Sequence, residues 1–312
     1  MRAFCGLALL SFLSIGRPSA NAQGLVHLRI DNDSFAHIDR WYSHRHELGI
    51  TSAIKRVDPN ASEHLLSWQL RLGQAMWTPR NIQFVEPPER DLHFAGYLYG
   101  DLGVLLRWTH HTLQVRARLG VIGPAAKAGP TQEAIHRVLG VRQPRGWGNQ
   151  LPNQAAGHAT ATYAYHRSWN VDGLRLGGAL LVRADLGNLA QRIRIATTLG
   201  AAYGITARAF AEVSEPTLSS GRCKSACVAL FVSGEATAVW HDLVVEASGA
   251  TDPPDIERRN GIGTLRFGFL VGGPRAWMRY VHHRQTRLFS TSPRVHPRNH
   301  RWGVFELGIP FG

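Results

Sequence analysis

The chain has 312 residues, long enough for one large domain, and its 35 lysines and arginines outnumber its 22 aspartates and glutamates to give a formal net charge of +13. Such an excess predicts an anionic partner. Because the first residues of the chain look like an export signal, an acidic polymer or a phosphorylated lipid is favoured over nucleic acid as this partner. Beyond residue 22 the chain lacks the ~18 consecutive apolar residues of a membrane-spanning helix.

Residues 1–22 have the features of a secretory signal peptide. Arg2 precedes a short apolar run, and Ala20-Asn21-Ala22 provides the small residues of a cleavage site. We therefore expect residues 1–22 to be removed and residues 23–312 to form one domain outside the cytoplasm. Cys223 and Cys227 are the two cysteines of that part. In an oxidising compartment this close pair could form a small disulfide loop, which the sequence leaves open.

Alternation of apolar and polar residues is the main pattern after the signal. Gln114, Arg116 and Arg118 fall on one face of a strand whose other face is apolar, and Glu306 lies opposite an apolar row in the last strand. Residues 160–169, 173–184, 264–271 and 277–283 are also strand-like. Polar residues inward and apolar residues outward predict an antiparallel transmembrane β-barrel. A soluble β-sandwich is the alternative, but the signal, the inward arginines and the aromatic residues near strand ends favour the barrel.

The connections predict how the strands are joined. Residues 170–173 and 272–274 look like short periplasmic hairpins. Longer connections at residues 33–45, 78–93, 123–156, 250–260 and 284–298 would be outer loops. The pattern gives about twelve strands, or fourteen if parts of 206–224 and 241–260 are strands. Both counts are even, as a bacterial barrel requires.

One outer loop contains a predicted helix. Gly and Pro residues between 123 and 130 lead into helix-forming residues, so Thr131 is a plausible N-cap and Glu133 would lie in the first turn. Gln132 and His136 are four residues apart and would share one face. A histidine beside an amide is a candidate general base. A surface helix whose Gln132 and His136 merely face solvent is the alternative.

The first strand delivers Asp31, Asn32 and Asp33 to its outer end. Clustered carboxylate and amide oxygens suit a hard cation such as calcium, although the same residues often form an ordinary turn. Ser43 could supply a hydroxyl to this site. It lacks a G-x-S-x-G setting, so a nucleophile elbow is not supported.

These residues resemble the outer-membrane lipid A 3′-O-deacylase family. The resemblance begins with Asn32-Asp33-x-Phe35 and Asp39-Arg40-x-Tyr42-Ser43, and it continues through Gly123-Pro124, Gln132-x-x-x-His136-Arg137 and Trp147-Gly148-Asn149-Gln150 in family order. The resemblance implies a twelve-stranded barrel in the bacterial outer membrane, with its active site at the extracellular face. It also implies calcium-dependent hydrolysis of the 3′-linked acyl ester of lipid A, carried in lipopolysaccharide.

Site residues follow from the resemblance by position. His136 matches the catalytic base and Gln132 the amide beside it, while Asn32 and Asp33 match the site pair at the first strand and would hold the calcium ion. Ser43 stands where the family usually has threonine. Three positions depart from the family: Arg142 replaces an acidic residue of some members, Arg80 is the nearest match to a lysine of some members, and Arg45 replaces a glycine.

Four arginines near the predicted outer rim could pair with lipid A phosphates, a contact that guanidinium groups suit. They are Arg40, Arg45, Arg80 and Arg137. We expect a monomer embedded in the membrane. The alternatives are an outer-membrane phospholipase with Ser43 or another serine as nucleophile, and a non-catalytic barrel or porin.

Overall fold

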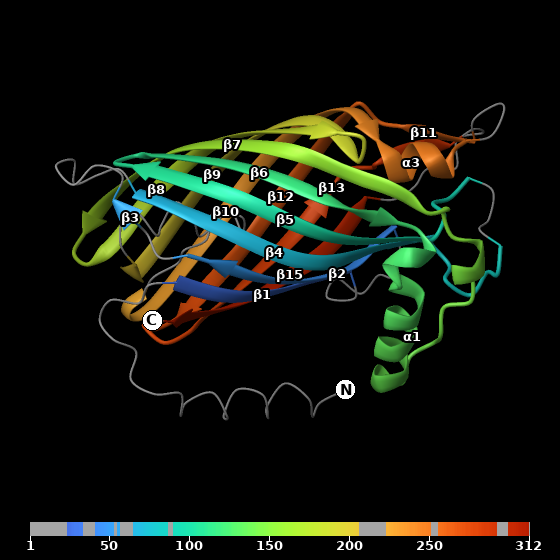
Figure 1. Cartoon of the computed structure of the whole chain (residues 1–312). Helices are drawn as coiled ribbons and strands as arrows, with labels where there is room; N and C mark the ends of the chain where they lie inside the picture. Colours follow the sequence, from blue (N-terminus) through green and yellow to red (C-terminus); the bar gives the residue numbers. More distant parts are fainter. Residues whose placement is uncertain are drawn as a thin grey trace.

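Twelve antiparallel strands form a closed barrel (Figure 1). The computed structural model describes residues 24–33, 41–52, 55–56, 65–86, 90–205, 223–250, 255–291 and 299–311. The barrel strands are β1 (Gly24–Asn32), β2 (Trp41–Thr51), β4 (Leu65–Thr78), β5 (Ala95–Trp108), β6 (His111–Ile122), β7 (Gln154–Val171), β8 (Leu174–Gly187), β9 (Ala190–Ile205), β10 (Cys223–Asp242), β12 (Gly261–Gly272), β13 (Trp277–Gln285) and β15 (His300–Phe311). Pairing of β1 with β15 and of β2 with β4 closes the ring. The predicted fold is confirmed, with twelve strands rather than fourteen; the predicted signal peptide lies outside the described residues.

The alternation seen in the sequence decides which side chains face the lumen. Gln114, Arg116 and Arg118 of β6 are buried, whereas Val115 between them and Leu119 after them are exposed. Successive side chains of a strand point to opposite faces. The wall of the barrel therefore presents apolar residues on its external surface and encloses polar ones.

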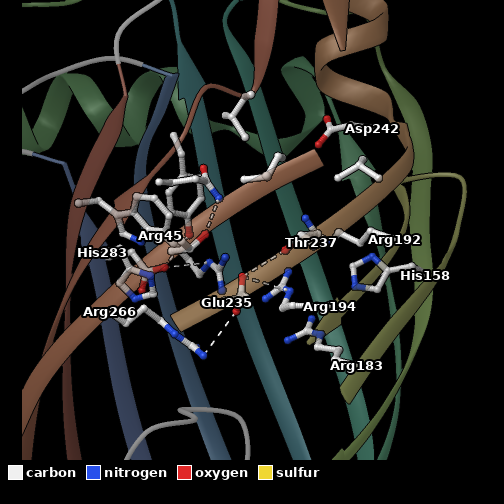
Figure 2. Close-up of a pocket in the computed structure, with 18 of the residues that line it drawn as sticks. Arg45, His158, Arg183, Arg192, Arg194, Glu235, Thr237, Asp242, Arg266 and His283 are labelled. Carbon is white, nitrogen blue, oxygen red and sulfur yellow. Dashed lines mark hydrogen bonds and ion pairs between the residues drawn. The ribbon is translucent and has the colours of Figure 1, made fainter. Parts of the chain in front are cut away.

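Charged side chains in the lumen contact one another (Figure 2). Glu47 accepts a hydrogen bond from the Tyr99 hydroxyl at 2.7 Å and lies 3.5 Å from a guanidinium nitrogen of Arg118. Asp101 accepts bonds from Arg116 and Arg118 at 2.9 and 2.8 Å. Burying a charge is unfavourable unless it is paired and hydrogen-bonded. These contacts explain how a closed barrel tolerates charged strands.

The two ends of the barrel differ. At one end, β7 and β8 are joined by Asp172 and Gly173, whose φ angles of 50° and 85° fit the tight turn of a hairpin. The opposite end carries α1 (Ala128–Leu139), α3 (Leu243–Ser248) and a small ladder of β11 (Ile256–Arg258) with β14 (Phe289–Thr291) (Figure 1). We call it the loop end. No helix in the described ranges is long and apolar enough to cross a membrane.

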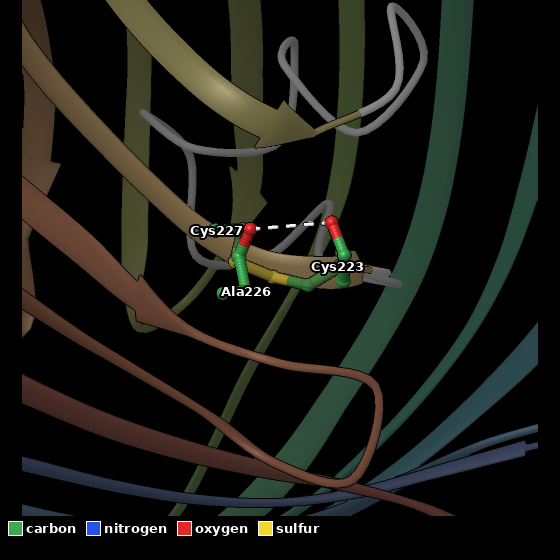
Figure 3. The surroundings of a disulfide bond; sticks show 4 residues. Cys223, Ala226 and Cys227 are labelled. Atoms are coloured by element: carbon green, nitrogen blue, oxygen red, sulfur yellow. Dashed lines mark hydrogen bonds between the residues drawn. A yellow bond between two sulfur atoms is a disulfide. The ribbon is translucent and has the colours of Figure 1, made fainter.

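Cys223 and Cys227 form a disulfide at the start of β10 (Figure 3). The pairing of β10 with β9 is regular from Val228 onward, but its register shifts between Cys223 and Val228. The bond therefore spans an irregularity in the strand, at the end away from α1. The sequence left this pairing open, and the structure contains it. A two-residue strand, β3 (Lys55–Arg56), pairs with β4 beside the same ring.

Candidate active site on the external surface of the barrel

At the loop end, four residues on four neighbouring strands form a row along the barrel wall. Asn32 of β1 pairs in register with His44 of β2, His44 with Met76 of β4, and Met76 with Gly96 of β5. Their neighbour Asp31 is buried in the lumen. Because side chains alternate along a strand, the four residues of this row face away from the lumen. The candidate site is therefore on the external surface of the wall.

The start of α1 covers part of this row. A Cβ added at Gly96 would lie 2.4 Å from the Cβ of Ala128, so only glycine permits this approach. The Gln74 amide also donates to the carbonyl oxygen of Ala126 at 2.6 Å. Beneath the helix lies a buried apolar cluster of Met76, Ile82, Phe94, Ala128 and Trp147. The helix is thus packed against the wall and is not a solvated appendage.

The helix begins four residues earlier than the sequence predicted. It starts at Ala128 with Lys127 as N-cap, and the φ of Lys127 is 56°. Thr131 is not the cap; its hydroxyl donates to the Lys127 carbonyl oxygen at 3.0 Å. Pro130 fits within the first turn because backbone N–H groups there have no partner inside the helix. Glu133 consequently lies beyond the first turn.

Gln132 is held in place by Trp147. The indole N–H of Trp147 donates to Oε1 of Gln132 at 2.8 Å, and the Gln132 side chain is buried. Since the oxygen of the amide is engaged, its nitrogen is the end that can donate to a substrate. Trp147 was part of the sequence motif, but the sequence did not reveal this contact across fifteen residues.

His136 lies one turn further along the same face, and its ring is oriented by the backbone. Nδ1 of His136 is 2.5 Å from the carbonyl oxygen of Arg142. A carbonyl can only accept, so Nδ1 carries a proton and Nε2 of the neutral ring keeps the lone pair. That is the tautomer a general base requires. Arg142, which stands where some members of the resembled family carry an acidic residue, thus orients the ring through its backbone oxygen.

A cavity of about 330 Å³ adjoins His136. It is lined by Arg80, Asn81, Ile82, Gln83, His136, Val141 and Arg142. Asp91 positions the rim of this cavity. The Asp91 carboxylate accepts the backbone N–H of Arg80 at 2.7 Å and the indole N–H of Trp41 at 3.0 Å. Burial raises the pKa of Asp91. Sequence reasoning did not identify Asp91, which resembles many other loop aspartates.

His44 is a second imidazole that sequence reasoning missed. Nδ2 of Asn32 lies 3.1 Å from Nδ1 of His44. An amide nitrogen only donates, so Nδ1 of His44 accepts and its Nε2 carries the proton. His44 and His136 lie close enough to interact electrostatically. The two rings thus hold opposite tautomers, one with a lone pair on Nε2 and one with a proton there.

Asp33 and Ser43 lie beside the row. The register of β2 shifts between Tyr42 and His44, so Ser43 is an extra residue in a bulge. Its hydroxyl is 2.5 Å from that of Thr78, and its carbonyl oxygen accepts the N–H of Asp33 at 3.3 Å. Asp33 is buried. The bulge therefore brings Ser43 to the end of β1.

The predicted calcium site has hard oxygen donors but few charges. Asp33 offers a carboxylate and Asn32 an amide oxygen, which are ligands that calcium accepts. Among the described residues, no group of three or more histidines, cysteines, aspartates or glutamates is placed to hold a metal ion. The donor chemistry fits a hard cation whose remaining ligands are neutral oxygens.

Of the four predicted phosphate-binding arginines, the three that the structure describes lie in different places. Arg80 lines the cavity beside His136. Arg137 is exposed on α1, and Arg40 lies outside the described residues. Arg45 does not lie on the outer rim as predicted but faces the lumen, where its Nε is 3.6 Å from Asp31. The reason is register: Arg45 pairs with Asp31, which also faces inward.

The closed ring, its apolar exterior and its long loops at one end define a β-barrel protein of the bacterial outer membrane. A family model described as "Outer membrane protein LpxR" matches residues 4–311, so the chain belongs to the LpxR family. This family modifies lipid A.

Among solved structures, the chain is similar to LpxR from Salmonella typhimurium, with a TM-score of 0.78 at 16% identity over 92% of this chain and 100% of that one. It is less similar to the beta domain of the Bordetella autotransporter BrkA, with a TM-score of 0.40 at 9% identity over 92% and 97% of the two chains. A comparison with curated protein sequences found no match.

Proposed function

We propose that the protein is a lipid A 3′-O-deacylase that hydrolyses the 3′-linked acyl ester with water activated by His136. The observation that carries this proposal is the hydrogen bond from Nδ1 of His136 to the Arg142 carbonyl oxygen, which leaves Nε2 as a base beside a cavity. Membership of the LpxR family supports the substrate class.

In this reaction His136 first accepts a proton and later returns it. Nε2 takes a proton from water, and the water oxygen attacks the ester carbonyl carbon to form a tetrahedral intermediate. The bond between that carbon and the sugar oxygen then breaks, and the leaving oxygen receives the proton from His136. The products are a fatty acid and a free hydroxyl on the sugar. A positioned base of this kind contributes about 10²–10⁴-fold to the rate.

Two neutral hydrogen-bond donors can take part in the same reaction. The side-chain nitrogen of Gln132 and the Nε2 proton of His44 can each hydrogen-bond an oxygen that gains negative charge. Both donors are pre-oriented, Gln132 by Trp147 and His44 by Asn32. Donors fixed before the reaction require no reorganisation as charge develops.

Calcium binding is part of the proposal. Asp33 and Asn32 would hold the ion, with other oxygens completing its shell. When bound, the ion supplies positive charge that stabilises an anionic oxygen. For the phosphates of lipid A, Arg80 and Arg142 provide two guanidinium groups in the cavity beside His136.

Ser43 is a poor candidate for the nucleophile of a phospholipase. Its hydroxyl is buried and shares its hydrogen bond with Thr78. A nucleophilic serine needs a base within hydrogen-bond reach, and a threonine hydroxyl cannot serve. This geometry favours attack by water over a covalent mechanism.

The test is mass spectrometry of lipid A from a host without such an activity, after expression of the chain. We expect loss of the 3′-linked acyl chain, and no labelling of the protein by a serine-reactive probe. Unchanged lipid A in cells whose outer membrane contains the folded protein would refute the proposed activity. Loss of an acyl chain from phospholipids instead would favour the phospholipase.

A further inference from the structure

The lumen contains a second cavity, separate from the one beside His136. Its volume is about 230 Å³, and nine arginines line it against four acidic residues, Asp31, Glu47, Glu235 and Asp242 (Figure 2). The proposed deacylase site is on the other side of the barrel wall. The charges of this lumen cavity therefore have no part in the proposed hydrolysis.

One carboxylate in this region is shared by three arginines. Asp185 accepts hydrogen bonds from Nε of Arg183 at 3.0 Å and from Nε of Arg192 at 2.7 Å. A guanidinium nitrogen of Arg194 lies 3.9 Å away, and the Thr160 hydroxyl donates to the same group at 2.7 Å. Asp185 neutralises one of these three arginines, so positive charge is left over around it.

A second carboxylate does not remove the surplus. Glu235 lies 3.6 Å from Nε of Arg194 and 3.4 Å from Arg266. Four guanidinium groups thus share Asp185 and Glu235. Nε of Arg194 is buried and makes no hydrogen bond within the described residues, since 3.6 Å is too long for one. Even with Asp242 at the top of the cavity counted, arginines outnumber carboxylates among the described residues that line the cavity (Figure 2).

His158 provides an independent indication of a ligand. Its side chain is 7% exposed and lines the cavity beside Arg192 (Figure 2). Nδ1 of His158 is buried without a hydrogen-bond partner in the described residues. A buried polar atom left unpaired costs about 1–3 kcal/mol. In native proteins such atoms usually pair with a protein group, an ordered water or an ion, and no described protein group pairs with this one.

We propose that this cavity binds a tetrahedral inorganic oxyanion of the phosphate or sulfate class, held by Arg183, Arg192, Arg194 and His158. Guanidinium groups match the oxygens of such an anion in charge and in forked geometry. The anion neutralises the surplus and links β7, β8 and β9. Because paired strands separate the lumen from the lipid-facing surface, the ligand is a soluble anion and not a lipid headgroup.

Isothermal titration of the folded, detergent-solubilised full chain with sodium phosphate tests the proposal, with ionic strength held constant by sodium chloride. We expect saturable binding of one phosphate at this site and a rise in Tm that equal chloride does not produce. The substitution Arg194→Gln should weaken Kd about tenfold or more, because hydrogen bonds to charged groups contribute about 1.5–3 kcal/mol. Arg167→Gln, which removes an exposed arginine of β7, should leave Kd unchanged.

Two further variants separate loss of the lumen site from misfolding and from binding in the cavity beside His136. Arg194→Lys retains the charge but loses the forked donor set, so it should fold like the wild type and bind with intermediate affinity. Arg80→Gln removes an arginine from the cavity beside His136 and should leave lumen binding intact. The proposal is overturned if wild type shows no saturable binding. It is equally overturned if Arg80→Gln abolishes that binding while both Arg194 variants retain it, or if chloride raises Tm as much as phosphate does.

Discussion

The lumen and the external surface use similar polar residues in opposite ways. In the lumen, charged groups neutralise one another, as where Glu47 contacts Arg118 and the Tyr99 hydroxyl. At the candidate active site, polar side chains are oriented by neutral partners: His136 by a carbonyl oxygen and Gln132 by an indole. A neutralised charge stabilises the barrel, whereas a histidine with one nitrogen engaged keeps the other for chemistry. Substitutions in the lumen should therefore change stability, and those at the candidate active site should change activity.

Replacing His136 with alanine should have the largest effect. Deacylation of lipid A should fall by about 10²–10⁴-fold because the base is removed, while the denaturant midpoint stays close to that of the wild type. Activity is measured on purified lipopolysaccharide in detergent. His282→Ala, on β13, is the matched control and should keep full activity. Wild-type activity in His136→Ala would show that another group is the base.

Glu47→Gln should have the opposite effect: it should lower stability and leave turnover unchanged. The substitution leaves the buried guanidinium groups around residue 47 without their carboxylate, and breaking a buried ion pair costs about 3–5 kcal/mol. Urea unfolding, followed by tryptophan fluorescence, measures the loss in free energy of unfolding. The folded fraction should retain wild-type turnover. Glu257→Gln, an exposed residue of β11, is the control, and equal stability of the two variants would contradict the assignment of Glu47 to a structural network.

Removal of divalent cations tests the proposed calcium site. A chelator should abolish deacylation, and added calcium should restore it in the wild type but not in Asp33→Asn. The expected loss is on the order of a hundredfold, since a bound cation supplies several kcal/mol of charge stabilisation. Asp255→Asn, in another loop, serves as the control. Full activity in the chelator would show that the hydrolysis needs no such ion.

The smallest effect is expected for His44→Phe. The variant loses the Nε2 proton and the bond to Asn32, so kcat should fall about three- to tenfold, the range of a single hydrogen bond. His44→Gln restores a donor and an acceptor and should recover part of that loss. His46→Phe changes the neighbouring ring on the same face and should have less effect. If both phenylalanine variants lose kcat equally, the effect is packing and not hydrogen bonding.

Much of the barrel could be predicted from alternation alone. Arg116, Arg118 and Glu306 fall on the polar face of their strands in the sequence, and all three are buried in the lumen. Local spacing also placed Gln132 and His136 on one face of a helix. The exact start of that helix could not be predicted, because Gly96 and Ala128, thirty-two residues apart, decide how closely it approaches the wall.

What the sequence by itself determined is the period-two pattern, and with it the barrel and an even strand number of twelve or fourteen. Helical spacing and the family resemblance indicated the candidate base His136. These depend on neighbours a few residues apart, which local sequence specifies. Tertiary structure alone decided which groups meet: the register that places His44 beside Asn32 and turns Arg45 inward to Asp31, the contact of Trp147 with Gln132, and the surplus of arginines around Asp185. Such contacts join distant strands and loops, so they depend on register and chain closure, which no short stretch of sequence specifies.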